Sequence, residues 1–261
     1  MYLTRWQAAI LDEVRRFRRV SIMALAKRLS VSDETIRRHV KGLADEGLVR
    51  RVHGAVALPE ELAEPPFRRR MEVEALAKRA IGRRMAALVE DGQTVMLDTG
   101  STTAYVAEAL AERRGLTIVA NSIETARPLV GRNDNRVMLA GGELRAHDAA
   151  ALGAGAVDFV RQFRADWAVL SVGGIDLRGG LMDHFLDEAV FARALIGQAE
   201  RTAVVADATK LGQRALVTIC PLGSIDVLVS NLPPPAVFER LLREADVEIV
   251  TTEPADEELA A

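Results

Sequence analysis

The stretch Asp98-Thr99-Gly100-Ser101-Thr102-Thr103 combines residue types that bind anions. Glycine lets the backbone approach a ligand, hydroxyl groups donate hydrogen bonds, and the amides at the start of a helix favour a negative charge. A helix is expected to begin near Ala104. Because serine and threonine are common at helix starts, this stretch alone is equally consistent with an ordinary cap. We treat it as a candidate phosphate-binding loop and call it the 98–103 loop. The residues that follow the other apolar runs decide between a ligand site and a simple cap.

Small, hydroxyl, amide or charged residues also follow other apolar runs. Together with the 98–103 loop they give five such positions, and the further candidate ligands are Asn121, Gly141, Gly142, Glu143, Gly173, Gly174, Asp176 and Lys210. In parallel sheets, ligands bind beyond the carboxyl ends of the strands. We expect the phosphate of a ligand to contact Ser101, Thr102, Thr103 and Lys210, and its hydroxyl groups to contact Asn121, Glu143 and Asp176.

Six apolar runs rich in valine, isoleucine and leucine must position these residues. They cover residues 94–97, 117–120, 136–140, 167–172, 202–206 and 227–230, and segments of helical pattern separate them. Alternating strands and helices predict an α/β domain with a mainly parallel sheet. A long amphipathic helix is expected before the first strand, over residues 72–89.

Three further helices are expected near the N-terminus. Apolar residues recur at helical spacing from Trp6 to Phe17, Ser21 can cap a second helix, and Ser32 can cap a third that ends at Gly47. In the third helix Ile36, Val40 and Leu43 are spaced to face the core, which leaves its basic residues on the other side. This layout predicts a recognition helix.

Residues 48–57 predict two short strands around the turn His53-Gly54. A helix fits the DNA major groove, and a basic hairpin beside it can reach phosphates or the minor groove. An ordinary solvated helix is the alternative, which the combination of three helices with a basic hairpin disfavours. The expected DNA-binding residues are Ser32, Thr35, Arg37, Arg38, His39, Lys41, Arg51, His53 and Gly54.

The charge of the chain is divided unequally along its length. The net formal charge is −3, but residues 1–58 hold twelve Lys or Arg against six Asp or Glu, a net of +6, and the remainder has a net of −9. A small basic module favours polyphosphate, whereas an acidic body repels nonspecific DNA. The charges therefore favour a DNA-binding module on an acidic sensor.

A length of 261 residues suggests two domains. We expect a winged helix-turn-helix domain over residues 1–58, a connection over 59–71 that contains Pro59, Pro65 and Pro66, and a sensor domain over 72–261. One small DNA-binding module offers too little contact area for tight selective binding. A homodimer or homotetramer is therefore expected.

Several function classes conflict with the composition. The longest apolar runs are much shorter than the roughly 20 residues of a membrane span, and the first residues lack a signal-peptide pattern, so a cytoplasmic protein without membrane contact is expected. The single cysteine, Cys220, lies in an apolar stretch, which predicts a buried and inert thiol. The four histidines lack ligand spacing, so neither a metal nor another cofactor is expected.

The motifs resemble those of the DeoR family of bacterial transcription regulators. In the N-terminal part the matching runs are residues 31–38, 43–47 and 50–55, although His39 stands where the family usually has an aspartate. The strand-end stretches match the sensor domain of the family, so the resemblance covers nearly the whole chain. It implies a regulator of operator DNA, repression as the default, and a sensor domain that resembles ribose-5-phosphate isomerase.

Residues 139–145, 158–159, 162–164, 174–176 and 233–235 resemble the subgroup that regulates glycerol 3-phosphate metabolism. This implies a phosphorylated metabolite as the effector, glycerol 3-phosphate in the first place, which lowers operator affinity. A sugar-phosphate isomerase is the alternative, because Asp98, Asp176 and Lys210 could serve acid–base chemistry. The isomerases that the sensor resembles carry more carboxylates where this chain has Gly173-Gly174-Ile175-Asp176, so no catalysis is expected.

Overall fold

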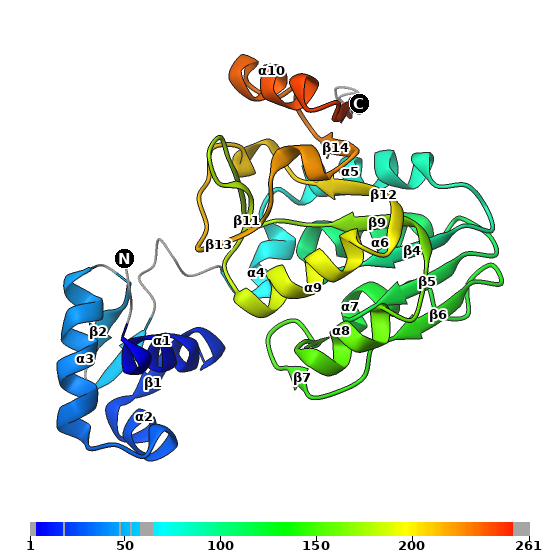
Figure 1. The fold of residues 1–261 in the computed structure, drawn as a ribbon. Helices are drawn as coiled ribbons and strands as arrows, with labels where there is room; N and C mark the ends of the chain where they lie inside the picture. The colour runs from blue at the N-terminus through cyan, green and yellow to red at the C-terminus, as the bar shows by residue number, and fades with distance from the viewer. Residues whose placement is uncertain (1–3, 18, 47, 53, 58–64, 253–261) are drawn as a thin grey trace, which may run out of the picture. The chain divides into compact units, whose positions relative to one another are not determined.

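The computed structural model describes residues 4–17, 19–46, 48–52, 54–57 and 65–252. The chain divides into two units, residues 1–64 and 65–261, and each is described by itself (Figure 1). Helix α4 (Phe67–Glu72) opens the second unit and begins within the connection that the prolines predict to be irregular. Phe67 is buried, so the apolar side chain anchors this segment to the sensor unit.

The N-terminal unit contains three helices and a small antiparallel sheet. The helices are α1 (Arg5–Phe17), α2 (Ile22–Leu29) and α3 (Asp33–Asp45); the strands are β1 (Arg19–Ser21), β2 (Arg50–Val52) and β3 (Ala55–Ala57), in the order β1-β3-β2. Ile10, Leu25, Ile36 and Leu43 are each fully buried in one apolar cluster that joins all three helices. The predicted winged helix-turn-helix fold is confirmed, and β1 adds a third strand that the sequence pattern did not reveal.

The predicted helix caps of this unit are confirmed in their geometry. The backbone amide of Ala24 donates to Ser21 Oγ at 3.1 Å, and that of Thr35 donates to Ser32 Oγ at 3.2 Å. Each bond satisfies an amide that has no partner inside its helix, which stabilises a helix by about 1 kcal/mol. Gly47, the predicted end of the third helix, lies outside the described residues.

The second unit is built on a seven-stranded parallel sheet of order β15-β14-β12-β9-β4-β5-β6. Its strands are β4 (Thr94–Leu97), β5 (Thr117–Ala120), β6 (Arg136–Leu139), β9 (Ala165–Leu170), β12 (Ala199–Val205), β14 (Val227–Ser230) and β15 (Glu248–Thr251). The helices and 3₁₀ turns are α5 (Ala75–Leu88), α6 (Ser101–Leu110), α7 (Ile123–Ala126), α8 (Ala154–Val160), α9 (Leu186–Ile196), η2 (Ala208–Lys210), η3 (Leu222–Ser224) and α10 (Ala236–Glu244). The predicted mainly parallel sheet is confirmed, with β15 as an additional edge strand.

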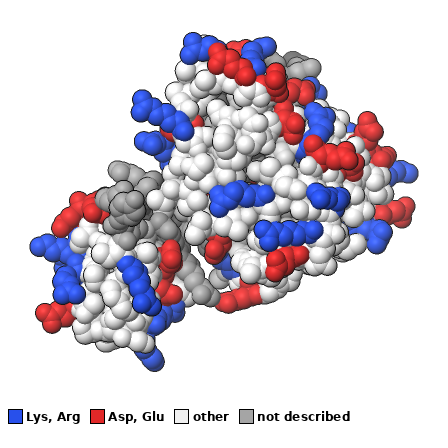
Figure 2. All heavy atoms as spheres, viewed as in Figure 1, with Lys and Arg blue, Asp and Glu red and all other residues white. Residues whose placement is uncertain are grey.

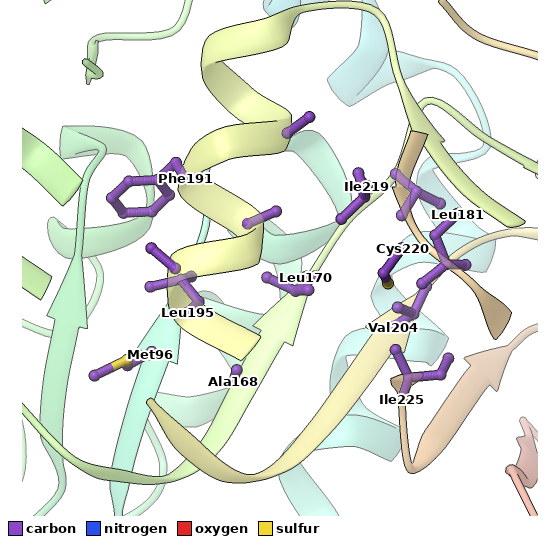
Figure 3. Packing of buried hydrophobic residues seen from close by; sticks show 14 of the residues in the cluster. Met96, Ala168, Leu170, Leu181, Phe191, Leu195, Val204, Ile219, Cys220 and Ile225 are labelled. Atoms are coloured by element: carbon purple, nitrogen blue, oxygen red, sulfur yellow. The ribbon is translucent and has the colours of Figure 1, made fainter. Parts of the chain in front are cut away.

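Helices cover both faces of this sheet (Figure 1). Along β4, Val95 and Leu97 pack with α5 and α6, whereas Met96 packs with α8 and α9 on the other face. The close view of the cluster on the face covered by α8 and α9 shows Phe191 and Leu195 of α9 beside Met96 and Leu170 (Figure 3). Complete burial of a side chain such as Phe191 contributes about 1.5–3 kcal/mol. The packed layers hold the strand ends in fixed positions.

The long helix expected over residues 72–89 is α5, which begins at Ala75 and ends at Leu88. Glu74 takes a left-handed backbone conformation with φ 54° and separates α5 from α4. The strands β10 (Gly174–Asp176), β11 (Gly180–Asp183) and β13 (Val217–Cys220) form a separate antiparallel sheet, and β7 (Leu144–Arg145) pairs with β8 (Ala150–Ala151). The predicted ligand residues after β9 therefore enter a hairpin.

The order of the strands places a topological switch beside β4. The chain runs from β4 through β5 to β6 on one side, and β9 then returns to the other side of β4. In open parallel sheets the connections diverge at this point, and ligands bind there beyond the carboxyl ends of the strands. The 98–103 loop follows β4, so it lies at the switch.

Candidate functional site

The face of α3 opposite the core carries exposed basic side chains. Arg37, Arg38 and Lys41 are exposed, whereas Ile36 and Val40 are buried. Lys and Arg side chains project from the N-terminal unit in the space-filling view (Figure 2). Exposed cations on a helix anchored by its opposite face suit the phosphates and base edges of the DNA major groove.

Other predicted DNA-binding residues on α3 have structural partners. The hydroxyl groups of Ser32 and Thr35 lie 2.9 Å apart and take part in the helix cap. His39 is half-buried, and its Nε2 atom is buried without a hydrogen-bond partner among the described residues. We therefore place Ser32 and Thr35 at the start of this surface and the half-buried His39 at its edge.

The hairpin β2–β3 forms the wing. Arg51 is exposed and pairs in register with Val56, while Val52 pairs with Ala55 across the turn. Gly54 has φ +70°, a conformation that glycine adopts without strain in a tight hairpin turn. His53, the other predicted residue of this turn, lies outside the described residues.

The 98–103 loop is packed tightly against the end of β9. A Cβ atom at Gly100 would lie 1.8 Å from Ser171 Oγ, so only glycine fits there. The amide of Ser171 donates to Asp98 Oδ2 at 3.0 Å. Burial raises the pKa of Asp98 well above its usual value, which the hydrogen bond from Ser171 only partly opposes. The loop is thus fixed by strands on both sides of the switch.

The first turn of α6 has the features of an anion site. No side chain caps this ten-residue helix, and Ser101, Thr102 and Thr103 are all buried in it. Thr103 Oγ1 donates to the carbonyl of Gly100 at 3.0 Å, so its hydroxyl already has an acceptor. Ser101, Thr102 and the helix amides are the donors best placed for a phosphate.

Asn121 joins this site from the adjacent strand. Leu97 of β4 pairs in register with Ala120 of β5, so Asp98 and Asn121 follow at neighbouring strand ends. Asn121 is fully buried, and its Nδ2 atom donates to the carbonyl of Ala151 at 3.0 Å. This register places Asn121 beside Asp98 of the 98–103 loop.

A buried ion-pair network adjoins the loop. Thr99 Oγ1 donates to Asp148 Oδ2 at 3.2 Å, and Arg145 pairs with both Asp148 and Glu188. Although burial opposes its charge, the two carboxylates hold the pKa of Arg145 above its usual value. The same arginine lowers the pKa of Asp148 against the effect of burial. The network therefore keeps its charged form and connects residues 145–148 to α9 and the loop.

The predicted ligand residues after β6 are exposed, and a different part of the same segment contacts the 98–103 loop. Gly141, Gly142 and Glu143 are exposed, whereas Arg145 and Asp148, a few residues further along, are the ones connected to Thr99. No Cβ clash constrains Gly141. Strand-end position alone could not show that the short ribbon β7–β8 turns back toward the sheet.

The residues predicted after β9 have structural roles. A Cβ atom at Gly173 would lie 2.8 Å from His184 Cδ2, and one at Gly174 would lie 2.4 Å from the carbonyl oxygen of Gln213. Asp176 Oδ2 accepts the amide of Gly179 at 2.6 Å, the main cause of its lowered pKa. These contacts support the β10–β11 hairpin, and the role predicted for Asp176 in binding ligand hydroxyl groups stays a prediction.

Two lysines lie near the carboxyl end of β12. Lys210 Nζ donates to the carbonyl of Gly173 at 3.5 Å, a long contact that leaves its charge available. Lys78 of α5 is 4% exposed, and its Nζ atom donates to the carbonyls of Arg70 and Val73 at 2.6 and 2.8 Å. Burial lowers the pKa of Lys78 to about 8, and the charges of Asp207 and Lys210 act on it.

Sequence reasoning missed five residues of this region. They are Lys78, Arg145, Asp148, Ser171 and Glu188. Only Lys78 gave a local signal, since a lysine on the buried face of an amphipathic helix needs a partner. The others come together only through the strand order.

The described residues give little support for a metal site, a reactive thiol or a membrane-spanning helix. They contain no group of three or more His, Cys, Asp or Glu side chains that could hold a metal ion. The thiol of Cys220 is buried, as the sequence predicts, and burial raises its pKa. Among these residues, no helix combines the length and apolar character required to cross a membrane.

Comparison with known families identifies both units. Residues 7–61 match the DeoR-like helix-turn-helix domain, and residues 73–231 match the DeoR C-terminal sensor domain. The two matches cover the α3 surface, the wing, the 98–103 loop and Lys210.

Similar proteins include named repressors. The chain is 33% identical to the glycerol-3-phosphate regulon repressor of Escherichia coli, over 95% of this chain and 99% of that protein. It is also 33% identical to the transcriptional repressor CsqR of the same organism, over 88% of each chain. Among solved structures, ribose 5-phosphate isomerase A of Methanocaldococcus jannaschii aligns with 53% of this chain and 55% of its own, at 16% identity and a TM-score of 0.39.

Proposed function

We propose that this chain, which belongs to the DeoR family of DNA-binding transcriptional regulators, represses genes of carbohydrate or glycerol metabolism until a phosphorylated metabolite binds. The observation that carries the proposal is the combination of two sites in one chain. Arg37, Arg38 and Lys41 are exposed on α3, and the 98–103 loop lies at the switch of the sensor sheet. The first suits DNA, and the second suits a small anion.

The chain is a regulator and not an enzyme. Both of its domains are DeoR domains, and the relatives that match nearly its whole length are named repressors. The contacts of Asp176 agree with this assignment, because this carboxylate accepts two backbone amides of its own turn. A base for isomerisation would have to be free to take a proton from the substrate.

Glycerol 3-phosphate is our first candidate for the effector, since the relative with 33% identity is named for the glycerol-3-phosphate regulon. Its phosphate would take the amides of the first turn of α6, the hydroxyls of Ser101 and Thr102, and the ammonium of Lys210. Hydrogen bonds between charged groups are the stronger ones. For release from DNA, the ligand must prefer the state of the protein with low operator affinity.

Lys210→Ala is expected to weaken the binding of glycerol 3-phosphate by about 10- to 100-fold, since one charged hydrogen bond is lost. Operator binding without the effector should not change, so the variant would repress without responding. Titration calorimetry of the full chain with glycerol 3-phosphate, fructose 1-phosphate and glycerol measures the first effect.

The matched control is Arg214→Ala, which removes an exposed cation outside the loop. Unchanged affinity of Lys210→Ala for every phosphate ester that binds the unmodified chain would refute this role of Lys210. Equal binding of glycerol and its phosphate would refute the phosphate site itself. Tighter binding of fructose 1-phosphate would replace only the first candidate.

The proposed repressor acts as a homodimer or homotetramer. Each chain has one recognition helix, and specific DNA sites of this type are bound by paired modules on two half-sites. Light scattering at micromolar concentration is expected to give two or four times the mass of the chain. A monomer that still protects a single operator from cleavage at nanomolar concentration would disprove the assembly.

A further inference from the structure

Two buried oxygen atoms without hydrogen bonds lie at the ends of neighbouring strands. Asp98 is 6% exposed and follows β4, and Asn121 is 0% exposed and follows β5. Within the described residues, neither Asp98 Oδ1 nor Asn121 Oδ1 has a hydrogen-bond partner. The register Leu97–Ala120 makes the two residues neighbours.

The other polar atom of each side chain is held by the backbone. Asp98 Oδ2 accepts the amide of Ser171 at 3.0 Å, and Asn121 Nδ2 donates to the carbonyl of Ala151 at 3.0 Å. A carbonyl oxygen can only accept, so it must face the nitrogen of the Asn121 amide rather than its oxygen. These bonds fix both side chains, and among the described residues neither Oδ1 atom has a hydrogen-bond partner.

An unsatisfied buried oxygen is destabilising, and native proteins contain few of them. Two at adjacent strand ends, beside an uncapped helix start at the switch of the sheet, indicate a place for ligand groups. Asn121 Oδ1 can only accept hydrogen bonds, and so can Asp98 Oδ1 when its carboxyl group is ionised, so a hydroxyl group, which can donate, suits this pair better than a phosphate or carboxylate oxygen.

We infer that Asp98 Oδ1 and Asn121 Oδ1 each bind one of two hydroxyl groups on adjacent carbons of the effector, so that the sensor selects a phosphorylated polyol with an intact vicinal diol. The inference rests on the proposed function and divides the 98–103 loop into two parts. Ser101, Thr102 and the helix amides take the phosphate, and Asp98 takes a hydroxyl. A hydroxyl group both donates and accepts, so it suits Asp98 in either protonation state.

The first test uses the unmodified full chain and pairs of ligands that differ by one hydroxyl group. Titration calorimetry compares glycerol 3-phosphate with 3-hydroxypropyl phosphate, and ribose 5-phosphate with 2-deoxyribose 5-phosphate. In the pair whose diol the site binds, removal of the hydroxyl is expected to weaken binding by about 10- to 100-fold, because a buried acceptor then loses its donor. Propyl phosphate, which has no hydroxyl group, should bind more weakly than glycerol 3-phosphate and 3-hydroxypropyl phosphate.

The second test combines a change in the protein with the removal of a hydroxyl group from the ligand. Asn121→Leu keeps the approximate size of the side chain and removes its oxygen, so in this variant the loss of the ligand hydroxyl should change affinity by less than about threefold. Thermal unfolding shows whether the variant folds, and Leu144→Asn, a change at an exposed site, is the control that must keep the full difference.

The outcomes distinguish a failure of the diol inference from a failure of the proposed function. Equal affinities within both pairs, or equal binding of propyl phosphate and glycerol 3-phosphate, would overturn the diol inference and leave the phosphate site intact. Failure of every phosphate ester to bind would instead overturn the proposed function. The ligand series decides the question even where Asn121→Leu does not fold.

Discussion

Replacing both Arg37 and Arg38 by alanine is expected to weaken operator binding by about 100-fold or more, the largest effect that we predict on DNA binding. Both side chains are exposed on α3, opposite Ile36 and Val40. A side chain that contacts a base edge contributes about 1–3 kcal/mol, and one that neutralises a phosphate contributes a slope of about −0.9 in log K against log salt. Fluorescence anisotropy with an operator selected from random DNA measures the affinity at several salt concentrations.

The double variant should also reduce that salt slope by up to about 2 if both arginines contact phosphates. Arg240→Ala is the matched control, because its side chain is 69% exposed on α10 in the sensor unit. Effector binding and thermal unfolding of the double variant should match the unmodified chain. Full operator affinity in the double variant would show that α3 is not the recognition helix.

Gly100→Ala is expected to abolish effector binding, because the new methyl group cannot fit. Its Cβ atom would lie 1.8 Å from Ser171 Oγ and 2.9 Å from Ser171 Cβ. The loop would have to move away from β9, and overpacking of this kind costs about 1–3 kcal/mol of stability. Calorimetry and thermal unfolding measure the two losses separately.

A second substitution makes the steric explanation specific. Ser171→Gly removes both clashing atoms, so the double variant Gly100→Ala with Ser171→Gly should recover stability relative to Gly100→Ala alone. Gly141→Ala is the control, since no atom lies within 4 Å of its added Cβ. If Gly100→Ala binds the effector as the unmodified chain does, the fixed position of the loop does not matter for binding.

The fold followed from local patterns because these patterns reflect burial. Val95 and Leu97 face one side of β4 and Met96 the other, and helices cover both, so the strand appears in the sequence as a continuous apolar run. Edge strand β15 was not predicted, and only Val250 in it is buried. The other edge strand, β6, was predicted although none of its residues is buried, because Val137, Met138 and Leu139 form a continuous apolar run.

The site was predicted in part, for a related reason. Asp98 and Asn121 were predicted as ligand residues because each directly follows a strand of the parallel sheet. Arg145 and Glu188 were not, because their meeting depends on the path of β7 and the position of α9, which no short pattern records. The turn that Asp176 closes was not predicted, because a carboxylate that closes a turn looks the same in sequence as one that binds a ligand.

The central claim is that one chain binds an operator through the N-terminal unit and loses affinity for it when a phosphorylated metabolite occupies the sensor unit. The most direct measurement is the anisotropy of a labelled operator, bound at half saturation, as glycerol 3-phosphate or glycerol is added. We predict that glycerol 3-phosphate lowers the operator affinity at least tenfold and that glycerol has no effect. An operator affinity that neither glycerol 3-phosphate nor any sugar phosphate changes, at concentrations up to millimolar, would contradict the account.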